Sequence, residues 1–139
     1  MGETAQNKSL VREFIEEVFN LGHVDVVSTY VSEDFVNHVG PPGNPSGRES
    51  VEHGYQMFTA GFPDWHTVIE DVIAEDDKVV FRGMASGTHQ GEFMGMAPTG
   101  RRVELPGVHI MRIAGGKIVE HWAFSDSGSL MRQLGATGS

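Results

Sequence analysis

The chain of 139 residues has no cysteine. Disulfides, thiolate nucleophiles and cysteine-based zinc sites are therefore excluded. Its seven histidines form no His-x-x-x-His motif, so the sequence predicts no other common metal site either. A protein without thiols is compatible with the cytoplasm, where we expect this one.

Positive charge is also scarce. Ten lysines and arginines stand against 19 aspartates and glutamates, which gives a net charge of −9. A nucleic-acid interface needs basic side chains gathered on one face, and Arg101-Arg102 is the only adjacent basic pair. Apolar runs long enough to cross a bilayer are missing as well. We therefore expect no nucleic-acid or membrane partner.

The N-terminal part of the chain has the pattern of helices. Apolar residues recur at helical spacing over residues 10–21, and Gly22 predicts the helix end. A short helix is expected over residues 25–30, with Asp25 as a possible N-cap. Residues 34–39 are expected to be extended. Ser46 and Glu49 then fit a capping box that opens a helix ending near residue 61.

Beyond residue 61 the pattern changes to β-structure. Turn signals separate four β-rich segments, at 65–75, 78–87, 101–113 and 117–126, and a last helix is expected at about 128–134. Helices followed by long antiparallel strands predict an α+β fold, in which helices cover one face of a curved sheet and leave a cavity for a small apolar ligand. We expect one domain over residues 1–139, with about 1–8 and 136–139 flexible.

Several motifs resemble those of the SnoaL-like polyketide (ester) cyclases. They are Phe-Pro-Asp-Trp at 62–65, Gly-Thr-His-Gln-Gly-Glu-Phe-Met-Gly at 87–95, Pro-Thr-Gly-Arg at 98–101 and Gly-Lys-Ile-Val-Glu-His-Trp at 116–122, followed by Gln-Leu-Gly at 133–135. The resemblance implies the cone-shaped fold of the nuclear-transport-factor-2-like and ketosteroid-isomerase-like proteins.

The resemblance also implies a cofactor-independent, intramolecular aldol-type ring closure on a polyketide ester. In this chemistry a carboxylate removes a proton from a methylene between two carbonyls. The enolate attacks a ketone or aldehyde of the same molecule, and an acid protonates the new alkoxide. Such a reaction needs a buried base with a raised pKa and a donor near the developing oxyanion.

The place of the acid/base aspartate in the family pattern, directly after the tryptophan, holds Ala123. The remaining carboxylate is Asp126, three residues on. It is a candidate general base and equally a candidate N-cap of the last helix, because it stands at a strand end. Three residues in a regular strand reverse the face, so the catalytic role requires a bulge or the strand-to-helix transition to re-aim Asp126.

Two histidines complete the predicted catalytic group. His109 alternates with Met111 and Ile113 and is expected to share their face, either as a core histidine or as a donor in a pocket. His121 alternates with Ala123 and is expected to face either the same cavity or the outer surface. Since a histidine titrates near neutrality, His121 is the local substitute for the missing aspartate.

The other candidate site residues are polar groups or form an aromatic and thioether lining, with ordinary core packing as the alternative for most of the apolar ones. They are Asn37, His38, Tyr55, Phe62, Trp65, Met84, Phe93, Met111 and Trp122. His89 is expected to organise loop 87–100 by hydrogen bonding, and this loop is either a lid or a structured connection.

Other functions stay open. A diverged relative would act as a hydroxylase, an isomerase or an epoxide hydrolase; the last needs an Asp-Arg-Asp cluster, to which Arg112 and Asp126 could contribute. Ala123 also fits a non-catalytic small-molecule-binding protein. In each case the expected ligand is a small apolar carbonyl or polyketide-like compound. We further expect a homo-oligomer, a dimer or tetramer, because broad antiparallel sheets commonly pair across a two-fold axis.

Overall fold

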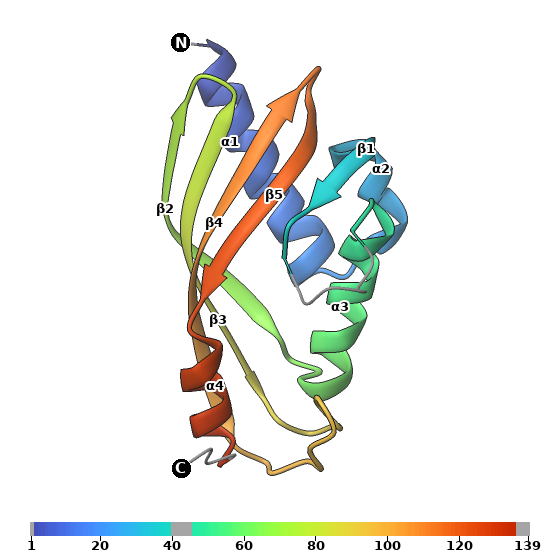
Figure 1. The fold of residues 1–139 in the computed structure, drawn as a ribbon, viewed down its shortest axis with the longest axis vertical. Coiled ribbons are helices and arrows are strands. Elements are labelled where there is room, and N and C mark those ends of the chain that lie inside the picture. Colours follow the sequence, from blue (N-terminus) through green and yellow to red (C-terminus); the bar gives the residue numbers. More distant parts are fainter. Residues whose placement is uncertain (1, 40–45, 136–139) are drawn as a thin grey trace.

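The computed structural model describes residues 2–39 and 46–135 (Figure 1). Helices come first, and the elements are α1 (Gly2–Phe14), the π-helix η1 (Ile15–Asn20), the 3-10 turn η2 (Val24–Val26), α2 (Val27–Tyr30), β1 (Val31–Asn37), α3 (Glu49–Gly61), β2 (His66–Glu75), β3 (Lys78–Thr88), β4 (Arg102–Ala114), β5 (Lys117–Ser125) and α4 (Ser127–Gln133). No helix in these ranges combines the length and apolar character that a membrane crossing requires. The α+β prediction is confirmed.

The five strands form one sheet in the order β1-β5-β4-β3-β2. The four strands β2 to β5 form three successive antiparallel pairs, whereas β1 lies parallel to β5 at the edge. Register irregularities in β1, β2 and between β4 and β5 break the regular ladder, which lets the strands bend. Figure 1 shows the long β4–β5 hairpin with α1 running alongside the sheet.

Strand alternation gives this sheet an inner face toward the helices and an outer face. Residues directly opposite each other share a face. Phe81 lies opposite His109, and Met111 lies opposite His121. Since Phe81 and Met111 are buried in the core, both histidines belong to the inner face. The predicted shared face of His109 and Met111 is confirmed.

Two apolar clusters fill the space between the inner face and the helices. The first packs the N-terminal helices on the sheet and includes Val11, Phe14, Val18, Phe81 and Met111. The second gathers the end of α3, the loop after β3, and α4, and includes Phe62, Trp65, Phe93, Val103 and Leu134. On β4 the inward positions between the two clusters are Gly107 and His109, so the histidine pair stands where one core ends and the other begins.

Some helix starts differ from the sequence predictions. Helix α1 begins at Gly2, so residues 2–8 are helical; residues 1 and 136–139 lie outside the described part. Asp25 lies inside a 3-10 turn and caps nothing. Ser46 does not open a capping box, because α3 starts after Arg48 without a side-chain cap. The Ser46 carbonyl instead accepts the backbone N–H of Asn37 at 2.7 Å.

The loop after β3 is a structured connection held by a buried histidine. His89 is fully buried, and its Nδ1 accepts the backbone N–H of Thr99 at 3.2 Å and lies 3.0 Å from the Thr99 hydroxyl. Its backbone N–H donates to the Arg101 carbonyl at 2.9 Å, and its own carbonyl accepts from Gly100 at 2.8 Å. The predicted loop-organising role of His89 is confirmed.

The π-helical turn docks the first helix on the edge strand β2. Its last residue, Asn20, accepts the Thr67 backbone N–H at 2.8 Å and donates to the Thr67 carbonyl at 2.9 Å. One amide side chain thus satisfies both backbone groups of a residue at the sheet edge, where no further strand pairs. Gly22, at φ +78°, ends this helical segment as predicted.

We expect Asn20→Ala to lower the free energy of unfolding by about 1–2 kcal/mol, because the two backbone groups of Thr67 lose their partners in a half-buried place. Urea unfolding measures the change. Gln56→Ala removes an exposed side-chain bond to Glu52 on α3 and should cost no more than about 0.5 kcal/mol. Equal losses in the two variants would contradict the docking role.

Candidate active site

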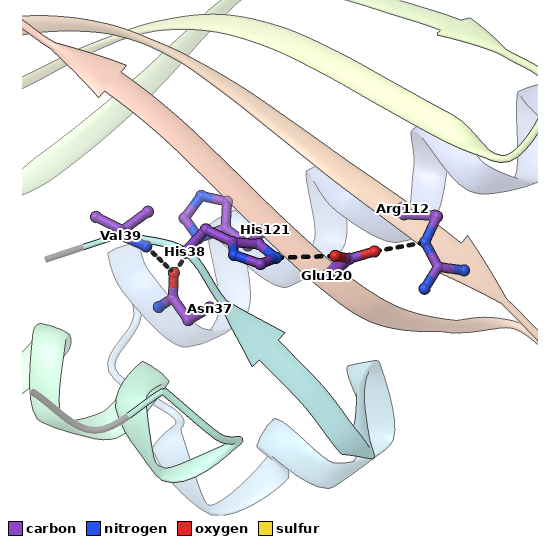
Figure 2. Close-up of polar contacts among 6 residues, drawn as sticks. All are labelled: Asn37, His38, Val39, Arg112, Glu120 and His121. Atoms are coloured by element: carbon purple, nitrogen blue, oxygen red, sulfur yellow. Dashed lines mark hydrogen bonds and ion pairs between the residues drawn. The ribbon is translucent and has the colours of Figure 1, made fainter. Parts of the chain in front are cut away.

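The site is built where β1 meets β5. Asn37 is the direct partner of His121 in this parallel pair, and the backbone N–H of His38 donates to the His121 carbonyl at 2.9 Å. Because successive side chains alternate, Asn37 and His121 lie on the inner face while His38 and Glu120 lie on the outer face. Figure 2 shows these neighbours around the end of β1.

A chain of hydrogen bonds runs along the inner face. The Asn37 Oδ1 lies 3.2 Å from His121 Nδ1, and His121 Nε2 lies 3.0 Å from His109 Nδ1. Asn37 is itself fixed, since its Oδ1 also accepts the Val39 backbone N–H at 3.0 Å and its Nδ2 donates to Ser50 Oγ at 3.1 Å. Three strands, β1, β5 and β4, therefore contribute one polar side chain each.

Donors and acceptors follow one fixed order along this chain of hydrogen bonds. An amide oxygen only accepts, so His121 must donate from Nδ1 and, when neutral, carries its lone pair on Nε2. That lone pair requires His109 to donate from Nδ1, which leaves the His109 lone pair on Nε2. Within the described residues His109 Nε2 has no hydrogen-bond partner. The arrangement therefore presents one basic nitrogen at the free end of the chain.

Both histidines are held neutral. Burial lowers the pKa of His109 to about 4. Burial, with smaller contributions from the neighbouring His109 and His38, lowers the pKa of His121 to about 3. The Phe81 ring stacks on His109 with 4.5 Å between centroids and 6° between planes, and an aromatic face solvates an imidazolium poorly compared with water.

The surroundings of His109 Nε2 are made of small residues. Ala123 lies directly opposite His109 on β5, and Gly83, Gly107 and Ser125 form the neighbouring row across β3, β4 and β5. A Cβ placed on Gly107 would lie 3.6 Å from His109 Nε2, and its three nearest atoms all belong to the sheet. No large side chain of this row stands beside the basic nitrogen.

The outer face carries a second polar chain. Glu120 accepts from Arg112 Nε at 2.7 Å and lies 2.8 Å from His38 Nε2. The His38 ring also stacks on Trp122, with 5.0 Å between centroids and 9° between planes. Hydrogen bonds from Arg112 and then His38 hold the pKa of Glu120 below its usual range.

The structure places Asp126 at the N-cap of α4, where its Oδ1 accepts the Ser129 backbone N–H at 2.9 Å. The residue is exposed, and the cap contact is the alternative that the sequence had left open. Arg112 binds Glu120 instead of Asp126, so the two residues considered for epoxide chemistry do not pair.

Three of the predicted site residues lie on the outer face of the sheet. Trp122 and His38 face outward, because strand alternation opposes them to His121 and Asn37. Met84 also faces outward, paired with the exposed Val68. Tyr55 lies against the bend after η1, since a Cβ on Gly22 would meet its hydroxyl.

The remaining apolar candidates are core residues. Phe62, Trp65 and Phe93 pack together in the second apolar cluster, and Met111 is buried in the first, opposite His121. One pocket, of about 760 Å³, is lined by α1 and the β4–β5 turn, and another, of about 470 Å³, by residues of η2, α2 and β1 and by the start of α3. Neither includes His109 or His121, so the cavity predicted between the layers stays a prediction.

Several contributors were missed in the sequence. Phe81 and Ser50 contact the inner chain, and Glu120 binds His38. Alternation around His121 could have indicated that Glu120 faces outward beside Arg112, but nothing local indicates that Phe81 or Ser50 reaches the site. Within the described residues no three histidine, aspartate or glutamate side chains are gathered as a metal site.

Comparison with known proteins identifies the family to which this chain belongs. The family model for SnoaL-like polyketide cyclases matches residues 9–134, which include every member of both polar chains. The chain belongs to this family. Its fold is accordingly the nuclear-transport-factor-2-like α+β cone that the motifs predicted.

Curated relatives and solved structures indicate the same family. The chain is 32% identical over 129 residues to the nogalonic acid methyl ester cyclase of Streptomyces nogalater, covering 84% of this chain and 89% of that protein. It is 29% identical over 130 residues to the aklanonic acid methyl ester cyclase DauD of Streptomyces sp. (strain C5), covering 91% and 80%. The crystal structure of IdmH from Streptomyces antibioticus superposes with a TM-score of 0.83 at 35% identity, covering 94% and 99%.

We expect the protein to lose stability as the pH falls from about 6.5 to about 4. In this window the unfolded chain binds protons at His109 and His121, whose ordinary pKa is 6.5, whereas the folded chain does not. Stability is therefore fully present above about pH 6.5 and is lost on acidification.

Urea unfolding at about pH 7.5 and about pH 4.5 measures this loss for the wild type and for His109→Asn, which lacks one of the two titrating rings. The variant should lose less free energy of unfolding between the two pH values than the wild type. His53→Asn, at an exposed position of α3, is the control and should behave like the wild type. The same loss in all three proteins would contradict the buried neutral pair.

Proposed function

We propose that the protein closes a ring in a polyketide-type ester or a related small carbonyl compound, with His109 Nε2 as the group that moves the proton. The observation that carries this proposal is the directed chain from Asn37 through His121 to His109, which ends in an unpartnered basic nitrogen. Similarity to the nogalonic and aklanonic acid methyl ester cyclases supports the substrate class.

The reaction is an intramolecular aldol closure. His109 Nε2 takes a proton from a methylene between two carbonyls, and the electron pair of that C–H bond passes into an enolate. The enolate carbon bonds to a ketone or aldehyde carbon of the same molecule, whose oxygen becomes an alkoxide. The alkoxide then takes the proton back from His109, so that no atom is gained or lost and no cofactor is consumed.

The proposed base has a lowered pKa and not the raised pKa that the sequence analysis expected of the base, so charge separation must be brief in this site. With Ala123 opposite His109, no carboxylate of that strand pair stands beside the imidazolium, and burial already disfavours it. The proton should therefore pass from carbon to the alkoxide of the same substrate without leaving the pair. The row of Gly83, Gly107 and Ser125 places no large side chain next to His109 Nε2, where the substrate would bind.

Further parts of this proposal concern the assembly. A homo-oligomer is supported by apolar side chains on the outer face of the sheet, since Val68, Ile73 and Phe124 are exposed there by 53, 65 and 68% and isologous sheet faces are a common mode of pairing. A cytoplasmic location and a cofactor-free reaction belong to the proposal as well.

We expect His109→Asn to lower kcat for nogalonic or aklanonic acid methyl ester by about 100-fold or more, because asparagine keeps a donor toward His121 but has no basic nitrogen. Product formation followed by chromatography measures the rate. Asp126→Asn keeps a capping side chain at α4 and tests the other candidate base.

Near-wild-type turnover by Asp126→Asn, together with an inactive His109→Asn, supports the histidine. The reverse result assigns the proton transfer to Asp126. A wild type that binds these esters without turnover would instead indicate a binding protein, the alternative that Ala123 supports.

The pH dependence of kcat/KM should be flat through about pH 6.5, where an exposed histidine titrates. The base must be neutral to accept a proton, and the pKa of His109 is about 4, so activity should fall only on acidification toward that value. Initial rates across the range in which the protein stays folded test this, with folding followed by circular dichroism. An inflection near pH 6.5 would contradict a buried neutral base.

A further inference from the structure

The outer polar chain of His38, Glu120 and Arg112 has no part in the proton transfer described above, because it lies on the opposite face of the sheet. Its place is nevertheless specific. It sits at the end of β1, on the other face of the sheet from the Asn37–His121 contact, and Figure 2 draws the residues of both chains close together. This place makes the outer chain a candidate for holding the end of β1 at this point of the sheet.

The pairing of β1 with β5 is short and irregular. After Val31 the register shifts, and only Val36 and Asn37 face partners on β5 near the site. The backbone adds one bond beyond the strand, from His38 N–H to the His121 carbonyl at 2.9 Å. An edge strand with so few ladder bonds depends on side chains for its exact position.

The outer chain supplies those contacts. Glu120 is directly opposite Arg112 across the β4–β5 ladder, and their 2.7 Å bond fixes its carboxylate. The other carboxylate oxygen holds the His38 ring at 2.8 Å, and Trp122 stacks on the same ring. A charge-assisted bond and a parallel stack thus tie the end of β1 to β4 and β5 from outside.

On the inner face, the position of the β1 end determines the position of one oxygen atom, the Asn37 Oδ1. Asn37 precedes His38 in the chain, so the backbone that carries one side chain places the other. The Asn37 Oδ1 must stay 3.2 Å from His121 Nδ1 to keep that nitrogen protonated, and through it the lone pair on His109 Nε2. A hydrogen bond weakens steeply with distance and angle. A small shift of the β1 end would therefore weaken this bond, and His121 and His109 would no longer each be held in one tautomer.

We propose that Glu120 is a positioning residue: by holding His38 on the outer face, it sets the tautomers of His121 and His109 on the inner face. The inference deepens the proposed function and rests on it for its catalytic consequence. Glu120 touches no reacting atom, because the sheet separates it from the inner face. Its effect should therefore appear in kcat and in the tautomers, while the KM stays close to that of the wild type.

The direct test is the ¹⁵N NMR spectrum of histidine-labelled protein without ligand, in which protonated and unprotonated ring nitrogens differ in chemical shift. The wild type should show protonated Nδ1 and unprotonated Nε2 on both His121 and His109. Glu120→Ala and His38→Phe should each give mixed tautomers at His121. Phenylalanine keeps a ring over Trp122 but cannot bind Glu120, so it separates the bond from the stack.

Asp71→Asn is the matched control, because Asp71 forms an exposed ion pair with Arg82 on the same outer face, at 2.8 Å, away from β1. It should leave the histidine spectrum and the rate unchanged. In cyclisation assays Glu120→Ala should lower kcat by about tenfold, as expected when a reacting group is slightly misplaced. Glu120→Gln keeps an acceptor for Arg112, and its amide N–H can donate to His38 Nε2 once that ring is protonated on Nδ1 instead. It should therefore recover part of that loss.

Wild-type tautomers in Glu120→Ala would overturn the inference, as would a spectrum disturbed equally by Asp71→Asn. The spectrum separates this outcome from a failure of the proposed function. If His109→Asn turns over at the wild-type rate, the assigned base is wrong, yet the tautomer comparison still decides whether Glu120 positions the pair.

Discussion

The hydrogen bond from His121 to Asn37 Oδ1 is the contact on which the proposed chemistry of this protein depends. An amide oxygen cannot donate, and this one is fixed by Val39 and Ser50. It therefore assigns every proton in the chain up to His109. A carboxylate in the same place would also accept, but it would favour a charged imidazole. The amide oxygen therefore fixes which ring nitrogens are protonated without adding a charge to the site.

The location of the His109–His121 pair follows from the division of the core into two apolar clusters. The first apolar cluster ends at Phe81 and Met111, and the second begins beyond Gly107. Between them a row of small residues leaves the inner face of the sheet without large apolar side chains. Two neutral histidines in such a place cost less than two charged ones would, and their remaining polar atoms are partnered except for the one that faces the proposed substrate.

Ala123 affects the chemistry of the site more than its shape. The sequence resemblance implied a carboxylate at this position, where the chain has a methyl group directly opposite His109. Removing that carboxylate removes the partner that would stabilise an imidazolium, which is consistent with the low pKa of both rings. The chain has the family's fold and a pair of neighbouring histidines, and we infer that the proton shuttles within the substrate complex.

The sequence by itself determined the elements and their faces. Helical spacing and Gly22 predicted the first helical segment and its end, and the period of two placed His109 with Met111, because both signals are local. Motif resemblance predicted the family. The same alternation also opposes Trp122 to His121, so assigning Trp122 to the lining conflicted with information already in the sequence.

Only the tertiary structure decided which residues meet. Asn37 and His121 are 84 positions apart, and no local pattern indicates that β1 returns to lie parallel to β5. Likewise, the carboxylate of Asp126 had two local interpretations, and the start of α4 decided that it binds Ser129. Long-range pairing depends on how the helices and the sheet bury their apolar faces together, and that requirement is a property of the whole chain.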